Sequence, residues 1–374
     1  MKILFTGGGS GGHFYPLIAV AQAVFDRARE KKIIPPKLYY MAPVEYNPRA
    51  LFDNDIEFIK VPAGKIRRYF SVLNFFDIFK TIAGMFIALW KMFKIYPDIV
   101  FAKGGYVSFP ALFAARILHI PVIIHESDSS PGRVNAWAAK FAQKIAVSYP
   151  EASQYFNESK VAFTGNPIRK EIITPLTNGA REFLHLEDDT PIITILGGSQ
   201  GAQNINDIIL DALPELVQRF QIIHQTGKNN FDMVNKTAGI VLKDNKYAHR
   251  YHPFDYLNDL SMRMVAGCTN IMISRAGSTI FEIAVWGIPS IIIPLPKAIS
   301  HDQEKNAFSY SHSGACTVIE ELNLNAHILM SEIDRIVNNK SISDKMSEAA
   351  KHFSHINAAQ KIAEVILETG LSHE

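Results

Sequence analysis

The stretch IMISRAGSTIFEIAVWGIPSIIIPLP at residues 271–296, with HDQEKNA at 301–307, decides the fold. A short apolar strand leads into small residues at 274–279, where a helix begins and offers free N–H groups and a positive dipole end to an anion. Glu282 lies one turn in, at a reach suited to the paired hydroxyls of a ribose. GIP at 287–289 ends the helix and starts a second buried strand. Taken alone, the stretch is more typical of an ordinary α/β helix start with a solvated Glu282.

Two further glycine-rich loops favour a ligand site. GGGSGGH at 7–13 follows a predicted strand at 3–6 and precedes an apolar helix from Phe14 to about Arg29. GGSQGA at 197–202 follows a strand at 192–196 and opens a helix that reaches Gln218. The first loop matches the G-x-G-x-x-G dinucleotide fingerprint, but so many consecutive glycines satisfy many patterns. We interpret both loops as cradles for a phosphate or sugar phosphate.

Composition sets broad limits. A chain of 374 residues predicts two domains, and 48% hydrophobic with 20% charged residues is typical of a globular protein. A net charge of +2 argues neither for nor against nucleic acid. Cys268 and Cys316 show no metal-ligand spacing and no disulfide framework, which fits a reducing cytosol. MKILFTGG runs directly into a strand without the apolar segment of a signal peptide, so we expect no export.

Strands and helices alternate along the chain, which implies mostly parallel sheets. Because each half starts with strand, glycine loop and helix, we predict two doubly wound, Rossmann-like α/β domains with a ligand in the cleft between them. GNP at 165–167 is interpreted as the hinge, and His125, at a strand end, as structural. Further strands are predicted at 37–42, 98–101, 122–124, 144–148, 161–164, 221–225 and near 248–251, and further helices after Pro110, from about Arg133 to Trp137, near 256–265 and three times in the tail, the last at 358–368.

Residues 65–96 differ from the rest of the chain. They hold six cations and one acid, beside a helical stripe formed by Phe75, Phe79, Ile82, Phe86, Trp90 and Phe93. The longest uncharged run, residues 81–90, is half of the roughly 20 residues that a spanning helix needs. The segment therefore does not cross a bilayer. The sequence leaves two interpretations open: a core helix with a solvated basic face, or an interfacial helix on anionic lipid.

Eight motifs in order resemble one known family. They are GGGSGGHFYP, FAKGGYVSFP, the HES-to-VNAW segment, GNPIR, GGSQGA, HQTGK, SRAGSTIFEI and HDQEKNA, and they cover nearly the whole chain. Together they resemble the MurG family of bacterial glycosyltransferases. The resemblance implies the GT-B fold, with an acceptor and membrane-associating domain at 1–164 and a UDP-sugar donor domain at 165–352. A last helix at about 353–374 would pack back on the first domain.

The resemblance also implies a reaction and its location. N-acetylglucosamine would be transferred with inversion from UDP-N-acetylglucosamine to the muramyl 4-hydroxyl of an undecaprenyl-diphosphate-linked muramyl pentapeptide. This step belongs to peptidoglycan synthesis, at the cytoplasmic face of the bacterial plasma membrane. The enzyme would be peripheral, with the anionic membrane surface as a partner and no nucleic acid.

Site residues follow from the resemblance by position. His13 would be the catalytic base, and Gly104, Gly105 and Tyr106 would face the acceptor. Asp128 stands where the family usually has an amide, and its carboxylate would repel a nearby diphosphate. The remaining donor-binding residues would be Ser10, Gly11 and Gly12 near the reacting centre, Arg169 and Ser199 at the diphosphate, Ser278 and Thr279 beside it, Glu282 at the ribose, the main chain near Phe254 at the uracil, and Gln303 at the sugar.

The chemistry is consistent with this assignment. Displacing a nucleoside diphosphate develops negative charge on the leaving group, which N–H groups, helix dipoles and Arg169 can stabilise. No Asp-x-Asp metal clamp lies beside the loops, so we expect no metal or other cofactor. The incoming hydroxyl needs a base with a pKa near neutrality, and a histidine beside a glycine loop fits.

Several other functions remain open from the sequence. A different GT-B glycolipid synthase would share most of these motifs. A UDP-sugar 2-epimerase would not need the basic aromatic segment at 65–96, and a dehydrogenase would need only one dinucleotide site. A non-catalytic UDP-sugar sensor or scaffold at the membrane would bind the nucleotide sugar without turnover.

Overall fold

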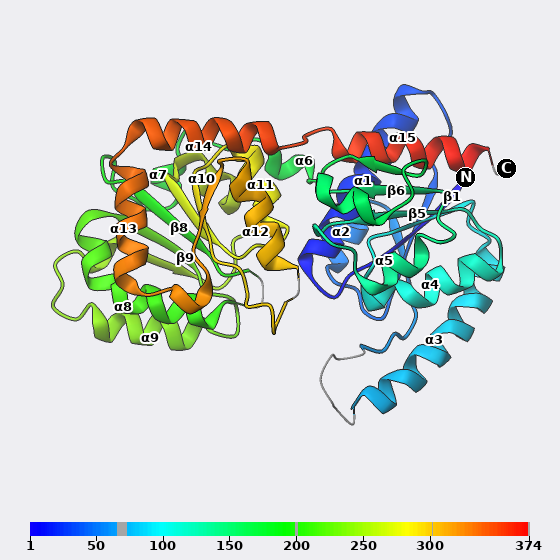
Figure 1. Ribbon diagram of the computed structural model, residues 1–374, viewed down its shortest axis with the longest axis horizontal. Helices are drawn as coiled ribbons and strands as arrows, with labels where there is room; N and C mark the ends of the chain where they lie inside the picture. Colours follow the sequence, from blue (N-terminus) through cyan, green and yellow to red (C-terminus); the bar gives the residue numbers. More distant parts are fainter. Residues whose placement is uncertain (66–72, 199–200, 301, 373–374) are drawn as a thin grey trace. The chain divides into compact units, whose positions relative to one another are not determined.

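The computed structural model describes residues 1–65, 73–198, 201–300 and 302–372, and it divides into two compact units (Figure 1). The N-terminal unit comprises Met1–Arg169 and His355–Glu374, and the C-terminal unit comprises Lys170–Ser354. The chain thus passes between units at Arg169/Lys170 and Ser354/His355, whereas the sequence analysis placed the boundaries at 164/165 and 352/353.

A parallel seven-stranded sheet, ordered β3-β2-β1-β4-β5-β6-β7, forms the centre of the N-terminal unit. The strands are apolar almost throughout, because helices cover both faces of the sheet. The order reverses direction between β1 and β4, which makes their carboxyl ends the topological switch point. The strands are β1 (Lys2–Thr6), β2 (Lys37–Ala42), β3 (Ile56–Lys60), β4 (Ile99–Ala102), β5 (Val122–Glu126), β6 (Lys144–Val147) and β7 (Val161–Phe163).

Helices cover the two faces of this sheet. On one face, α1 (Gly11–Glu30) lies beside α15 (Ala358–Leu371), and their apolar side chains share a core with Ile3 and Phe5 of β1 (Figure 1). Lys31, at the carboxyl end of α1, pairs with Glu364 in the middle of α15 at 3.3 Å. The other face is covered by α3 (Leu73–Ile95), α4 (Gly105–Ile117) and α5 (Arg133–Ala138). Two shorter helices, α2 (Pro48–Asp53) and the 3₁₀ helix η1 (Pro150–Tyr155), complete the unit.

Helix α4 begins earlier than expected. The prediction of a start after Pro110 was wrong, because the helix already begins at Gly105 and continues through the proline. Helix α1 likewise contains Pro16 in its second turn. A proline at this depth removes one backbone hydrogen bond, and packing on the sheet outweighs that loss.

A parallel six-stranded sheet, ordered β10-β9-β8-β11-β12-β13, forms the C-terminal unit, with its switch point between β8 and β11. The strands are β8 (Ile192–Leu196), β9 (Gln221–Gln225), β10 (Tyr251–Phe254), β11 (Ile271–Ser274), β12 (Ser290–Ile292) and β13 (Cys316–Val318). The helices are α6 (Lys170–Ile173), α7 (Ala180–Phe183), α8 (Gln203–Arg219), α9 (Phe231–Val241), η2 (Ala248–Arg250), α10 (Asp259–Cys268), α11 (Thr279–Trp286), α12 (Gln303–His312), η3 (Glu321–Asn323), α13 (Ala326–Val337) and α14 (Lys340–Phe353).

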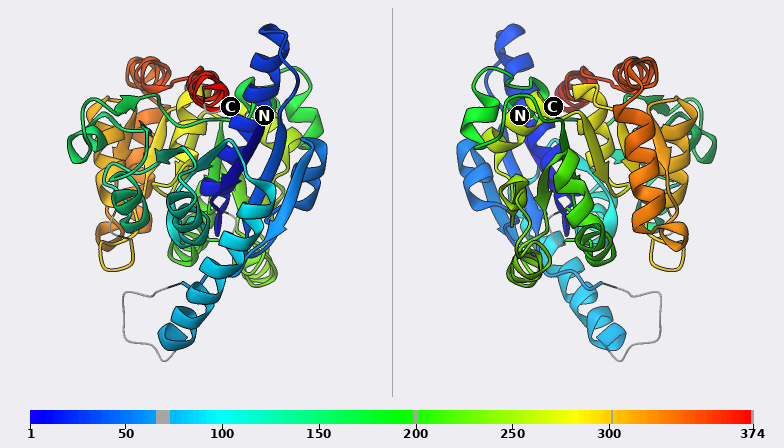
Figure 2. Two further views of the ribbon diagram at one scale, coloured as in Figure 1. Left: turned by 90° about the vertical axis from the view of Figure 1, so that its right-hand side faces the viewer. Right: turned by 90° about the vertical axis from the view of Figure 1, so that its left-hand side faces the viewer.

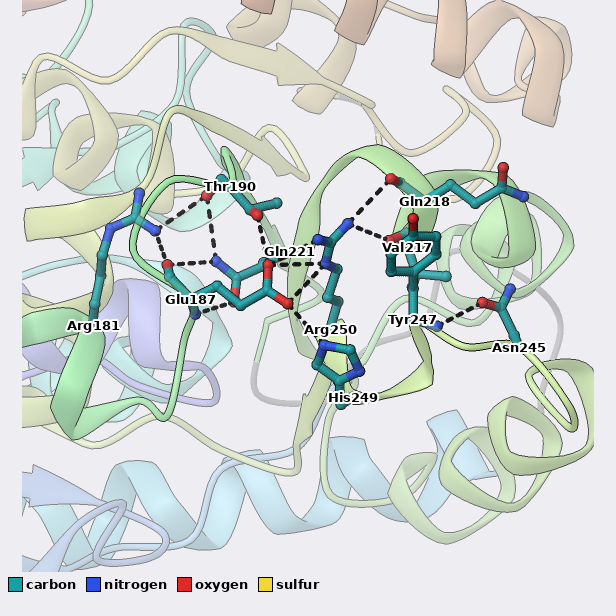
Figure 3. A network of polar contacts seen from close by, with 10 residues as sticks. All are labelled: Arg181, Glu187, Thr190, Val217, Gln218, Gln221, Asn245, Tyr247, His249 and Arg250. Atoms are coloured by element: carbon teal, nitrogen blue, oxygen red, sulfur yellow. Dashed lines mark hydrogen bonds and ion pairs between the residues drawn. The ribbon is translucent and has the colours of Figure 1, made fainter.

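A polar network at the amino edge of this sheet corrects one predicted strand (Figure 3). The carboxylate of Glu187 accepts from Arg250 Nε at 3.0 Å, Thr190 Oγ1 at 2.6 Å and His249 Nε2 at 2.8 Å. Its backbone N–H donates to Gln221 Oε1 at 2.7 Å. To reach Glu187, residues 248–250 form a 3₁₀ turn, so the strand predicted near 248–251 starts only at 251.

The predicted fold class, two doubly wound α/β domains, is confirmed. Figure 2 shows each unit as a layered arrangement of helices over its own sheet. Across the described residues, no helix has the length and apolar character that crossing a bilayer requires.

Candidate functional site

Four loops at the two switch points carry most of the predicted site residues. In the N-terminal unit they are the loops from β1 to α1 and from β4 to α4. In the C-terminal unit they are the loops from β8 to α8 and from β11 to α11. Ligands of doubly wound sheets bind at such points, because neighbouring strands send their helices to opposite faces and leave a crevice.

Tight packing explains the glycines at the start of the first loop. Gly7 has a φ of +152°, and a Cβ there would lie 2.9 Å from the Cβ of Lys103. Its carbonyl accepts from Tyr40 Oη at 2.6 Å. The loop ends at Ser10, whose carbonyl accepts from the backbone N–H of His13 at 3.2 Å. Ser10, Gly11 and Gly12 therefore form the uncapped start of α1.

The structure places His13 beside the predicted acceptor residue Gly105, and Tyr106 beside the first glycine loop. His13 Nε2 lies 3.9 Å from the position that a Cβ on Gly105 would take. The Tyr106 ring lies 3.5 Å from the corresponding position at Gly9. The Nδ1 atom of His13 is buried and has no hydrogen-bond partner among the described residues. Burial, and to a smaller extent Lys103, lowers the pKa of His13 to about 4, below the near-neutral value that the sequence analysis assumed for a base, so the imidazole is unprotonated at pH 7.

Gly104 and Asp128 border a buried carboxylate. Gly104 has a φ of +80°, and a Cβ there would lie 2.5 Å from Oδ1 of Asn135. Asn135 Nδ2 donates to Glu126 Oε2 at 2.9 Å. The other oxygen of Glu126 accepts from the backbone N–H of Asp128 at 3.1 Å. Burial, with a contribution from Asp128, raises the pKa of Glu126 to about 7. Glu126 thus fixes the loop after β5, and with it Asp128.

Arg169 contacts an aromatic ring from α1. Its guanidinium carbon lies 3.9 Å from the ring centroid of Tyr15, within cation–π distance. A Cβ on Gly11 would lie 3.4 Å from the same ring. Arg169 is therefore held near the first glycine loop. Tyr15 was not predicted as a site residue, because an aromatic residue in an apolar helix is usually part of the core.

The C-terminal unit carries the predicted diphosphate and ribose residues. Ser199 lies outside the described residues. Helix α11 starts after Ser278 without a side-chain cap, and Thr279 and Glu282 occupy its first turn. These N–H groups and the dipole suit an anion. The neighbouring Arg275 forms an ion pair with Glu321 and is structural.

Two further residues that were predicted to bind the UDP-sugar already have hydrogen-bond partners within the C-terminal unit. The carbonyl of Phe254 accepts from Thr226 N at 2.9 Å and from Thr226 Oγ1 at 3.3 Å. Gln303 Oε1 accepts from the backbone N–H of Leu295 at 3.1 Å. This contact fixes the side chain at the start of α12 and leaves its amide N–H group as a donor.

Metal ligands are not gathered at either switch point. Across the described ranges, no cluster of three or more His, Cys, Asp or Glu side chains has the arrangement of a metal site. The N–H groups of helix starts and Arg169 are the groups here that suit an anion.

Family models and known proteins match most of the chain. The model of the glycosyltransferase family 28 N-terminal domain matches residues 3–147, and that of the family 28 C-terminal domain matches residues 192–365. A protein from Treponema denticola is 38% identical over 335 residues, 85% of this chain and 83% of its own. One from Bacillus thuringiensis is 33% identical over 98% of this chain and 99% of its own. Both are named UDP-N-acetylglucosamine–N-acetylmuramyl-(pentapeptide) pyrophosphoryl-undecaprenol N-acetylglucosamine transferase.

A solved structure supports the fold. MurG from Acinetobacter baumannii superposes with a TM-score of 0.72 at 24% identity, over 98% of this chain and 99% of its own. With both domain models matched and full-length relatives above 30% identity, the chain belongs to glycosyltransferase family 28.

Proposed function

We propose that the protein transfers N-acetylglucosamine, with inversion, from UDP-N-acetylglucosamine to the muramyl 4-hydroxyl of an undecaprenyl-diphosphate-linked muramyl pentapeptide. The observation that carries the proposal is the near full-length match to relatives named for this transfer, at 33–38% identity. The loops at the two switch points supply suitable groups for each substrate.

The N-terminal unit would hold the acceptor. The neutral imidazole of His13 accepts the proton of the attacking hydroxyl, as a general base with a lowered pKa does. Gly105, which lies beside it, and Tyr106, which lies beside Gly9, would border the acceptor. Donating this proton to His13 strengthens the nucleophile as the new glycosidic bond forms.

The C-terminal unit would hold the donor. The uncapped start of α11 faces the leaving diphosphate, and Glu282 accepts from the ribose hydroxyls. Together with Arg169, these groups stabilise the charge that develops on UDP, and we propose that no metal ion takes part. Addition of EDTA should then leave the rate unchanged.

Helix α3 would bind the membrane surface. Its aromatic stripe is exposed, with exposed fractions of 70% at Phe86 and 65% at Phe93, whereas Ala88 and Met92 form the buried side. Lys94 Nζ lies 3.8 Å from the ring centroid of Trp90. Figure 2 shows the helix projecting from the rest of the N-terminal unit. This exposure disfavours the core-helix interpretation, and exposed aromatics interleaved with lysines fit an anionic lipid surface. Arg67 and Arg68 of this segment lie outside the described residues.

The test is UDP release from UDP-N-acetylglucosamine, with and without the lipid-linked muramyl pentapeptide. We expect release that depends on the acceptor, with a disaccharide-linked lipid as product. Conversion of the nucleotide sugar without acceptor would indicate an epimerase, and binding without turnover would indicate a sensor. Either result would overturn the proposal.

A further inference from the structure

A buried lysine, Lys103, lies directly after β4 and beneath the first glycine loop. It is 1% exposed. Its Nζ lies 2.6 Å from His125 Nδ1, 2.7 Å from Ser127 Oγ and 3.1 Å from Asn166 Oδ1. These partners are buried, and none is a carboxylate. Lysine is rarely buried to this extent without a carboxylate in contact, so the site calls for a functional reason.

The contacts suit a protonated lysine. An ammonium donates to all three partners, whereas a neutral amine would donate to two of them and accept from the hydroxyl of Ser127. Because Lys103 donates to Nδ1, His125 carries its own proton on Nε2, which donates to the carbonyl of Gly165 at 3.1 Å. The ammonium thus joins the ends of β4 and β5 to the turn that leads to Arg169.

The positive charge of Lys103 acts on His13. The His13 ring packs against Gly105, two residues after Lys103. Burial lowers the pKa of Lys103 to about 7, while the carboxylates of Glu126 and Asp128 oppose that effect. Among charged groups, Lys103 acts on His13, and His125 is affected by both of them. Glu126 and Asp128 act on Lys103.

We propose that Lys103 is a positioning residue whose buried ammonium orders the turn before Arg169 and places a positive charge near the His13 imidazole. Its contacts with His125, Ser127 and Asn166 fix the charge in place. The effect on His13 is a property of the folded chain, and only its kinetic consequence rests on the proposed function.

The experiment measures the pKa of His13 directly, by NMR titration of the full-length protein with ¹³C-labelled histidines and no substrate. The His13 signal is assigned from its absence in His13→Ala. Lys103→Met removes the charge at similar side-chain length. Asn166→Asp preserves shape and adds a negative charge in contact with the ammonium. Lys140→Met, at an exposed lysine in the same unit, is the matched control.

We expect the pKa of His13 to rise by about 0.5 or more in both variants, because each removes or cancels a nearby positive charge. The Lys140→Met control should leave the pKa of His13 unchanged. If Lys103→Met does not fold, the isosteric Asn166→Asp variant decides the question. An unchanged His13 pKa in the folded variants would overturn the inference.

Enzyme kinetics then separate this inference from the proposed function. If His13 is the base, the acidic limb of the kcat/KM profile should move to higher pH together with the NMR titration. A shifted titration with an unmoved limb would support the role of Lys103 and contradict that of His13.

Discussion

The guanidinium of Arg169 stacks on the ring of Tyr15, 3.9 Å from its centroid. If Arg169 binds the donor diphosphate, Tyr15→Leu should raise the KM for UDP-N-acetylglucosamine about fivefold, because a cation–π contact contributes about 1 kcal/mol. Tyr15→Phe keeps the ring and should behave like wild type in steady-state kinetics. Equal impairment of both variants would instead implicate the tyrosine hydroxyl, which accepts from Asn47 Nδ2 at 3.4 Å.

His13→Ala should lower kcat by about 10²–10⁴-fold, the range for loss of a general base, with donor affinity near wild type. Because the base must be neutral and its pKa is about 4, the wild-type kcat/KM should fall only as pH drops towards 4. His312→Ala, at an exposed position on α12, is the control. A stability loss with unchanged kcat would make His13 structural.

Glu282→Ala should weaken UDP binding by about 2 kcal/mol, since a charged acceptor for two hydroxyls is lost. Isothermal titration calorimetry measures this directly. Binding of 2′,3′-dideoxy-UDP should be equally weak in wild type and variant, because that ligand lacks the hydroxyls. Glu348→Ala, on the exposed surface of α14, should change nothing. Wild-type affinity in Glu282→Ala would place the ribose elsewhere.

If α3 binds the membrane, loss of its charges and loss of its aromatic side chains should each weaken vesicle binding, as measured by sedimentation. Replacing Lys80, Lys91 and Lys94 with glutamine should weaken binding to anionic vesicles by about 1 kcal/mol per charge, and high salt should act likewise. Serine at Phe86 and Phe93 should weaken binding at every salt concentration. Phe52→Ser is the control, since that phenylalanine is 85% exposed but lies on α2. If none of these changes alters sedimentation with vesicles, α3 does not contact the membrane.

Glu187→Gln should destabilise the C-terminal unit by about 1 kcal/mol at pH 7, a modest value because the side chain is a third exposed. Hydrogen bonds from Arg250, Thr190 and His249 lower the pKa of Glu187 from 4.5 to about 2. A lowered folded-state pKa stabilises the protein above pH 4.5, and the gain disappears as pH falls from 4.5 towards 2. Denaturant unfolding of the wild type and of Glu187→Gln between pH 4.5 and 2 measures this difference in the free energy of unfolding. A difference that is independent of pH would contradict the assignment.

Short-range sequence patterns correctly predicted the strands, glycine turns and helices that neighbouring residues determine. The apolar run of β1, followed by glycines and an apolar helix, specified strand, turn and helix at once, and β8 and β11 repeated the arrangement. Two boundaries, the starts of α4 and of β10, were wrong for tertiary reasons. Helix α4 continues through Pro110 because it packs on the sheet. Residues 248–250 leave the strand conformation to reach Glu187, which lies about 60 residues earlier in the chain.

Side-chain surroundings were harder to predict than elements. The stripe of α3 has the same period whether it faces a core or solvent, and only the burial of Ala88 and Met92 on the other side decides between them. A lysine after a strand is usually solvated, so the burial of Lys103 was not predicted. Its partners come from β5 and from residue 166, and no spacing in the sequence joins them.

The position of α15 also affects the order in which the two units can fold during synthesis on the ribosome. The C-terminal unit is an insertion in the N-terminal one, so residues 170–354 emerge before the helix that completes the first sheet. Until then, the apolar side of α1 that Ile362 and Ile366 later cover has no partner. The first half of the chain is therefore the last to finish folding, and a truncated nascent chain would present that surface to chaperones and proteases.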